Sequence, residues 1–228
     1  MKLKLTEKKQ ETPDVTSFIF TPTEPVVWKA GQFVHYVLHH EPTDDRGSDR
    51  WFTNAAAPFE DQIKITTRIA YEKGSSFKTK LSSMAIGKNI EMSLVGGDFV
   101  LDDPSREYVF IAGGIGITPF RSILKELDHE KKPINVTLLY SNRDQDVVYK
   151  EELEDIATRN HNFHIHYIFS PEHIDADKIK ALIPNIQKPL FYVSGPEPMV
   201  ESLGNMLKDM GVAEDHLKQD WFPGYPAE

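Results

Sequence analysis

The chain has 228 residues, of which 39% are hydrophobic and 27% charged, and its 26 basic and 35 acidic residues give a formal net charge of -9. This composition is ordinary for a globular protein, and the acidic balance disfavours general binding to nucleic acid or to an anionic membrane surface. Because the chain has no cysteine, it contains no disulfide, no cysteine nucleophile and no thiolate-held zinc or iron–sulfur centre of its own.

The chain up to about Asp103 shows the alternation of apolar and polar residues that is typical of strands. Short strands are expected around residues 3–5, 15–20, 33–38, 50–53, 63–69 and 90–94. Six such strands predict a closed or nearly closed antiparallel barrel. One helix interrupts them, because Ser75 and Ser76 precede Phe77 and Leu81 at helical spacing.

The amino terminus gives no sign of a targeting or membrane segment. No charge-free run is long enough to span a bilayer, and the first residues, Met-Lys-Leu-Lys-Leu-Thr-Glu, alternate like a strand instead of resembling a signal peptide. We therefore expect a cytoplasmic protein without membrane insertion, and we leave its oligomeric state open.

After Pro104, strands and helices alternate, which predicts parallel strands joined by crossover helices. Strands are expected at residues 108–112, 135–140, 163–169 and 190–194, and helices from 119, over about 149–159, around 179–183 and over 199–210. The chain is thus expected to form two domains, an antiparallel barrel over residues 1–103 and an α/β domain over residues 104–228.

A glycine turn follows the first strand of this second half. Gly113, Gly114 and Gly116 allow a sharp bend and a close approach to the backbone. We expect Thr118 to cap the next helix and Pro119 to take its first position. Free N–H groups and the helix dipole favour an anionic or phosphate-bearing ligand there. The spacing differs from the usual dinucleotide fingerprint, so a turn without a ligand stays an alternative.

The strand segment Arg50, Trp51, Phe52 and Thr53 is a second candidate site. An arginine can bind a phosphate through two hydrogen bonds, an aromatic ring two residues later can stack on a flat ring, and the next hydroxyl can donate to a ring nitrogen. A basic group that could form a polyphosphate cradle comprises Arg50, Arg68, Lys73, Lys78 and Lys80. Taken alone, these residues also suit an ordinary strand and a solvated lysine face.

Taken together, these segments resemble the ferredoxin-NADP reductase superfamily, whose flavin-binding motif is usually written R-x-Y/F-S/T. The resemblance covers nearly the whole chain and runs, in order, through Gly31-Gln32-Phe33, Arg50 to Thr53, Thr67-Arg68, Ser75 to Lys78, Gly113 to Pro119, Tyr140 to Arg143, Ser194-Gly195-Pro196 with Met199, and Asp220-Trp221-Phe222. It implies a ferredoxin reductase-like fold with a flavin-binding barrel and an NAD(P)-binding α/β domain. It also implies a short oxidoreductase without an iron–sulfur domain of its own.

Site residues are implied by this resemblance position by position. Arg50 would contact the flavin phosphates, Phe52 would lie against the isoalloxazine ring, and Thr53 would hydrogen-bond near flavin N5. The implied flavin-binding residues are Arg50, Trp51, Phe52, Thr53, Thr67, Arg68, Ser75, Ser76, Phe77, Lys78, Thr118 and Phe222. The implied NAD(P)-binding residues are Gly113, Gly114, Gly116, Thr118, Pro119, Ser141, Asn142, Arg143, Gly195, Pro196 and Met199.

Catalytic roles are implied for Thr53, Ser194 and Asp220. Ser194 stands where relatives often have a cysteine near the place of hydride transfer, and Asp220 stands where an acidic residue is common. The aromatic residues from Trp221 onward could cover the flavin or pack on the barrel. No metal site is expected, since His161, His164 and His166 are interpreted as surface or structural residues.

The resemblance implies an FAD-dependent NAD(P)H oxidoreductase, in which hydride passes from NAD(P)H to flavin N5 and electrons then leave to a separate acceptor. That acceptor would be a ferredoxin, a flavodoxin, a haem protein or a small molecule. FMN stays an alternative to FAD. The coenzyme is left as NAD(P)H, because Arg143 permits a 2′-phosphate whereas Ser170-Pro171-Glu172 replaces the Ser-Arg of NADPH-preferring members. Two alternatives are a non-catalytic nucleotide-binding regulatory subunit and a reductase that releases flavin as its substrate.

Overall fold

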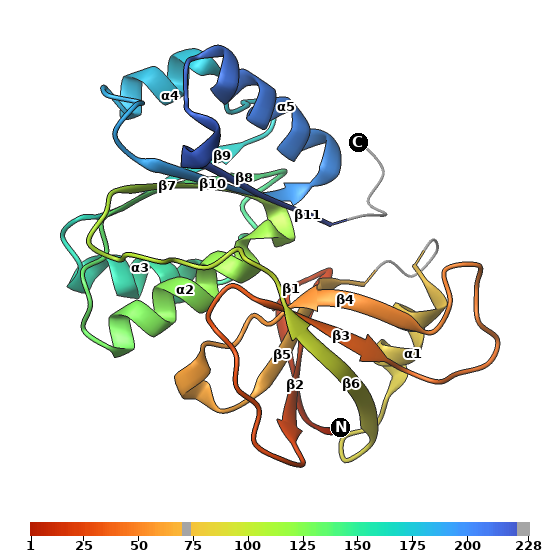
Figure 1. Ribbon diagram of the computed structural model, residues 1–228. Coiled ribbons are helices and arrows are strands. Elements are labelled where there is room, and N and C mark those ends of the chain that lie inside the picture. Colours follow the sequence, from red (N-terminus) through yellow and green to blue (C-terminus); the bar gives the residue numbers. More distant parts are fainter. Residues whose placement is uncertain (70–73, 223–228) are drawn as a thin grey trace.

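A computed structural model describes residues 1–69 and 74–222 of the chain. The described residues form two sheets, each with its own core, and Figure 1 shows the sheet of β1 to β6 below the sheet of β7 to β11. The predicted fold class, an antiparallel barrel followed by an α/β sheet, is confirmed.

The N-terminal sheet has six antiparallel strands in the order β4-β3-β6-β1-β2-β5. Side chains that alternate along a strand, such as Leu3 and Leu5, are fully buried, as the predicted period of two requires. The two edge strands are not paired as a ladder; just beyond the end of β4, Ala55 N donates to Lys64 O of β5 at 3.0 Å, and Lys64 N donates to Asn54 Oδ1 at 2.9 Å. The strands are β1 (Lys2–Thr12), β2 (Val15–Pro22), β3 (Phe33–Val37), β4 (Asp49–Thr53), β5 (Ile63–Arg68) and β6 (Asn89–Gly96), with a 3-10 turn η1 (Pro58–Glu60) before β5.

The helix expected in this half is α1 (Ser76–Ser83). Ser75 caps it, since its hydroxyl oxygen accepts a hydrogen bond from Lys78 N at 3.2 Å. Phe77 and Leu81 are fully buried in the barrel core. The predicted capped amphipathic helix is confirmed.

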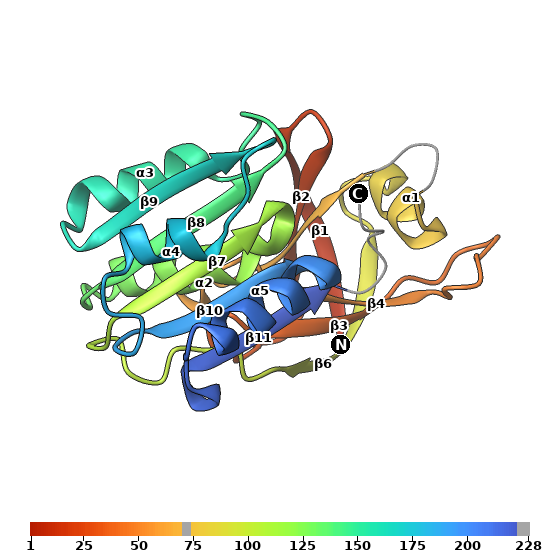
Figure 2. The same cartoon turned by 90° about the horizontal axis from the view of Figure 1, so that it is seen from above.

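The C-terminal sheet has five parallel strands in the order β11-β10-β7-β8-β9. Helices α2 and α3 cover one face and α4 and α5 the other, as Figures 1 and 2 show. The edge strand β11 was not expected from the sequence. The elements are β7 (Tyr108–Gly113), η2 (Gly114–Gly116), α2 (Ile117–His129), β8 (Val136–Asn142), α3 (Lys150–Arg159), β9 (Phe163–Phe169), α4 (Ala176–Leu182), β10 (Leu190–Pro196), α5 (Glu197–Asp209), η3 (Glu214–His216) and β11 (Leu217–Phe222).

A buried polar cluster joins the two sheets. Arg121, on α2, is 2% exposed, and its guanidinium donates to Ala55 O at 2.6 Å and to Glu60 at 2.8 Å. On its own side it lies 2.6 Å from Glu152 of α3 and over the ring of Tyr149. We call Arg121, Glu60 and Glu152 the Arg121 cluster, and it ties η1 of the first half to two helices of the second.

Among the helices in the described ranges, none combines the length and the apolar character needed to cross a membrane.

Candidate active site

The first group of predicted site residues meets at the amino end of α1. Arg50 and Phe52 are two residues apart on β4 and therefore share one face of the strand. The Arg50 guanidinium lies over the ring of Phe77, 5.5 Å from its centroid. Phe52 packs on the same ring, with centroids 5.9 Å apart. The structure thus brings Arg50 and Phe52 to the start of the helix that Ser75 caps.

Asp44, which the sequence did not single out, lies at the same place. Its carboxylate accepts hydrogen bonds from Ser76 N at 2.8 Å and from the Arg46 guanidinium at 2.7 Å. The hydrogen bond from Ser76 N is the main cause that lowers the pKa of Asp44 to about 2. We call Asp44, Arg46, Arg50 and Ser76 the anion cradle. The cradle holds a carboxylate that stays ionised at neutral pH.

Arg50 has one unused donor beside this carboxylate. Its Nη1 atom donates to the carbonyl oxygens of Arg46 and Gly47, at 2.6 and 3.3 Å. Its Nη2 atom is buried, lies 3.7 Å from an Asp44 oxygen and makes no hydrogen bond to any described residue. An Arg50 N–H and a helix N-terminal N–H directed at one place suit a phosphate oxygen, so the residues present fit a phosphate-bearing cofactor.

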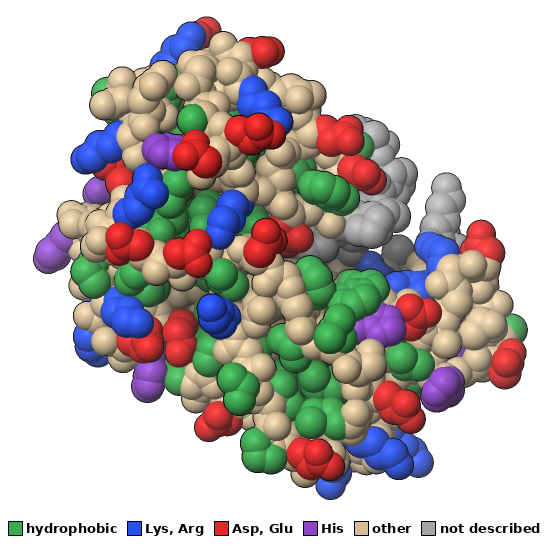
Figure 3. Space-filling model, viewed as in Figure 1, with side chains coloured by type: hydrophobic (Ala, Val, Ile, Leu, Met, Phe, Trp, Pro, Cys, Tyr) green, Lys and Arg blue, Asp and Glu red, His purple; other side chains and the backbone are tan. Residues whose placement is uncertain are grey.

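Trp51 and Thr53 alternate with these residues along β4. Trp51 is 49% exposed, and its ring packs on His35 and Phe33 with centroids 4.4 and 5.1 Å apart. Leu94 is also exposed, and Figure 3 shows hydrophobic side chains gathered on the visible face of the barrel. Thr53 is 4% exposed at the end of the strand. Trp51 therefore belongs to a different surface from Phe52.

The helix after the glycine turn begins earlier than the sequence predicted. α2 begins at Ile117 directly after the 3-10 turn, so Thr118 lies within the first helical turn and Pro119 is the third residue. The Thr118 hydroxyl donates to Ile115 O at 3.2 Å, and Gly116 stands at the cap position. The predicted capping role of Thr118 was wrong, because the 3-10 turn continues into the helix without an extended residue that could cap it.

Close packing explains the glycines of this turn. A Cβ on Gly116 would lie 2.2 Å from Ser194 O, so no larger residue fits without a shift of β10. A Cβ on Gly113 would lie 2.3 Å from the sulfur of Met199. Gly114 has φ of +49° and faces open space. The turn is thus held against β10 while the backbone at Gly114 stays accessible to a ligand.

Ser194 and Asp220 are neighbours across β10 and β11. Ser194 is fully buried, with Gly195 and Pro196 directly after it. Burial raises the pKa of Asp220 to about 6, repulsion from Asp98 adds to the rise, and the Ser194 hydroxyl opposes it. A carboxyl group with this pKa can take up or release a proton near neutral pH.

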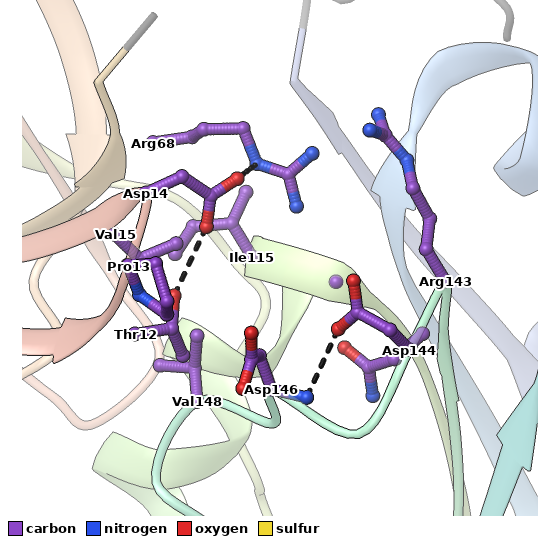
Figure 4. A pocket seen from close by; sticks show the side chains of 12 residues that line it. Thr12, Pro13, Asp14, Val15, Arg68, Ile115, Arg143, Asp144, Asp146 and Val148 are labelled. Carbon is purple, nitrogen blue, oxygen red and sulfur yellow. Dashed lines mark hydrogen bonds and ion pairs between the residues drawn. The ribbon is translucent and has the colours of Figure 1, made fainter.

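A cavity of about 220 Å³ lies between the two sheets. In Figure 4, Arg68 from the barrel and Arg143 from the end of β8 reach toward it from different sides. Arg68 is held by Asp14, at 3.0 Å. Arg68 therefore lies with residues predicted to bind the dinucleotide, whereas Arg50 does not line this cavity. The lining residues are Thr12, Pro13, Asp14, Val15, Arg68, Gly114, Ile115, Asn142, Arg143, Asp144, Asp146 and Val148.

Several other predicted site residues lie elsewhere in the two halves of the chain. Thr67 is buried in β5, and Ser141 is half-buried in β8 beside Asn142. Lys73, the side chain of Phe222 and the aromatic tail from Pro223 lie outside the described residues. Within the described part of the chain, no group of three or more histidine, aspartate or glutamate residues is arranged to hold a metal ion.

Comparisons with known proteins agree with this architecture. Residues 110–204 match the family described as Oxidoreductase NAD-binding domain. The chain is 24% identical over 235 residues to the glycine betaine monooxygenase reductase subunit of Chromohalobacter salexigens, which covers 96% of this chain and 63% of that protein. The chain spans 58% to 63% of the length of the first curated relatives that it matches.

Solved structures show the same fold. The flavohem-like FAD/NAD binding domain of nitric oxide dioxygenase from Vibrio cholerae superposes with a TM-score of 0.84 and 21% identity, covering 97% of this chain and 98% of that one. The ferredoxin-NADP+ reductase of Plasmodium falciparum gives a TM-score of 0.82 and 19% identity, covering 97% and 95%. The chain thus shares the two-domain fold of these structures, and its residues 110–204 are similar to the oxidoreductase NAD-binding domain.

Proposed function

We propose that the chain is an FAD-dependent NAD(P)H oxidoreductase that passes electrons to a separate acceptor. The observation that carries this proposal is the pairing of two nucleotide-suited sites, one in each half of the molecule. The barrel supplies the anion cradle beside Phe52, and the α/β domain supplies the glycine turn at a cavity between the sheets. The relative named as a monooxygenase reductase subunit and the neighbour named as an FAD/NAD binding domain support it.

In this proposal, residues 1–103 hold the flavin. Arg50 Nη2 and Ser76 N–H bind the phosphate oxygens, and the ring of Phe52 lies against the flavin ring system. The bound flavin supplies acceptance of a hydride at N5 and release of single electrons. Thr53, at the end of the same strand, hydrogen-bonds near N5.

Residues 104–228 hold the coenzyme in this proposal. The open backbone at Gly114, with Asn142 and Arg143 after β8, binds NAD(P)H in the cavity between the sheets. Arg68 acts on this coenzyme instead of on the flavin, a role that its position in the cavity wall supports. Ser194 and Asp220 hold a proton beside the reacting ring, which the raised pKa of Asp220 supports.

The acceptor is a separate one-electron carrier, such as a ferredoxin, a flavodoxin or a haem protein. The name of the monooxygenase reductase subunit supports this choice, because a reductase subunit serves a second protein. A cytoplasmic location is part of the same proposal.

The absorption spectrum of the purified protein tests this function. A yellow protein that bleaches when NADH or NADPH is added without oxygen is the expected result. Arg50→Ala should lose flavin on gel filtration, whereas Arg159→Ala, a control that removes an exposed arginine on α3, should retain it. A protein that binds no flavin after incubation with FAD would refute the proposal. Bound flavin that NAD(P)H does not bleach would favour the non-catalytic subunit.

A further inference from the structure

The anion cradle is filled by a side chain of the protein itself. We propose that Asp44 is an internal competitor for the flavin phosphate, so that the cradle binds a phosphate-bearing flavin only when the Asp44 carboxylate leaves it. This inference rests on the proposed function, since it concerns the same site. The inference makes Asp44 a residue that determines how strongly a flavin binds and which flavins bind.

Asp44 makes the contacts that a bound phosphate would need. One oxygen accepts from Ser76 N at 2.8 Å, and the other lies 3.7 Å from the unused Nη2 of Arg50. The backbone also participates, because Asp44 N donates to Ser76 Oγ at 3.0 Å. Ser76 Oγ lies 2.9 Å from a ring nitrogen of His40 as well. The carboxylate is therefore held at the amino end of α1 by both of its oxygens and by its own backbone.

A phosphate and this carboxylate cannot share these donors. Both are anions that favour a helix N-terminus and an arginine, and two anions at hydrogen-bond distance repel each other. Asp44 lies between β3 and β4, in a loop where the next two residues are exposed. Rotation of its side chain into solvent frees Ser76 N and Arg50 without moving either strand.

The competition depends on the phosphate and not on the ring. Riboflavin carries no phosphate, so its binding does not require Asp44 to leave, whereas FMN and FAD do require it. Removing the charge of Asp44 should therefore strengthen binding of FMN and FAD by about tenfold, the equivalent of one charge-assisted hydrogen bond, and leave riboflavin unchanged.

The test compares Asp44→Asn with Asp45→Asn in the full chain. Asp45 is the exposed neighbour, and its side chain makes no hydrogen bond or ion pair with the described residues, so this variant makes the same charge change outside the cradle. Protein stripped of flavin is titrated with riboflavin, FMN and FAD, and binding is followed by quenching of flavin fluorescence. We expect tighter FMN and FAD binding in Asp44→Asn alone. Equal or weaker binding of both, or an equal gain for riboflavin, overturns the inference.

A measurement on the unmodified chain gives a second test that does not depend on the variant folding. In a two-dimensional NMR titration with FMN, the Ser76 amide signal should shift as its acceptor changes from carboxylate to phosphate, and riboflavin should not cause this shift. A Ser76 signal that FMN leaves unmoved overturns the inference. If Arg50→Ala weakens FAD binding while Asp44→Asn changes nothing, only the competitor role of Asp44 fails. If no flavin binds to any form of the protein, the proposed function fails as well.

Discussion

Removal of Arg121 is the sharpest test of what holds the two halves of the molecule together. The side chains of Arg121 and Glu60 are 3% and 12% exposed, so this ion pair is shielded from water. Arg121→Met keeps most of the volume but removes the most buried cation that Glu60 and Glu152 share, leaving, among the described residues, only Lys125 beside both, at 3.9 and 3.3 Å. Breaking a buried pair from one side costs about 3–5 kcal/mol in free energy of unfolding, because the remaining charge stays buried.

The pKa of Glu60 gives a second route to the magnitude. Burial would raise this pKa, but hydrogen bonds and charge from Arg121, with help from Lys64, lower it from 4.5 to about 2. At 1.36 kcal/mol per unit, that shift corresponds to about 3 kcal/mol of stability. Because the folded pKa is lowered, this stability is present above about pH 4.5 and is lost as the pH falls toward 2. In Arg121→Met, burial dominates and the contribution disappears.

Urea unfolding followed by circular dichroism, from about pH 7 down to about pH 3, measures the stability lost in Arg121→Met and the pH dependence of that loss. We expect Arg121→Met to be about 3–5 kcal/mol less stable than the unmodified chain near neutral pH. This difference in stability should become smaller in acid. Arg159→Met is the matched control, because Arg159 is 44% exposed and its ion pairs should contribute less than about 1 kcal/mol. The reasoning is refuted if the two variants lose similar stability at neutral pH, or if the Arg121→Met gap widens in acid.

Two further predictions concern the candidate-site end of the C-terminal sheet. Since the folded pKa of Asp220 is raised from 3.8 to about 6, the folded state binds more protons and stability should fall as the pH rises through this interval. Asp220→Asn should match the unmodified chain below about pH 4 and exceed its free energy of unfolding by about 3 kcal/mol above pH 6. A stability difference that stays constant across this pH range would contradict this. Gly116→Ala should lower the free energy of unfolding by about 3 kcal/mol, because its Cβ would meet the Ser194 carbonyl. Gly87→Ala, at φ of +88° with open space around it, should lower it by about 1 kcal/mol. Equal losses of stability in thermal unfolding would contradict the packing argument.

The regular elements were predictable because their signals are local. The alternation around Leu3 and Leu5, the cap at Ser75 and the fully buried run from Tyr108 are each contained within a few residues, and all three were confirmed. The predicted capping role of Thr118 was wrong, because a threonine suits both a helix cap and the second position of a helix. Here α2 continues directly from a 3-10 turn, so Thr118 takes the second position. Strand β11 was missed since half of its residues, Leu217–Phe222, are polar or charged and it lies at a sheet edge, where it pairs with one neighbouring strand.

The site was predictable only where a short motif marks it. Arg50 and Phe52 share a strand face by their spacing, and the helix start at Ser75 follows from its own cap. Asp44 meets Ser76 across 32 residues, and Arg121 meets Glu60 across 61. In sequence, Asp44 and Glu60 are ordinary acidic loop residues. Contacts of this kind arise when the strands and helices come together, and the pattern of one sequence does not contain them.

Trp51 offers an optical reporter for the proposed flavin. Its indole is 49% exposed on one side of β4, while Arg50 and Phe52 face the other side of the same short strand. The emission band of an indole overlaps the absorption of an oxidised flavin. Energy transfer across the strand would therefore quench the fluorescence of Trp51 when the flavin is bound. Occupancy could then be followed in real time without any added dye.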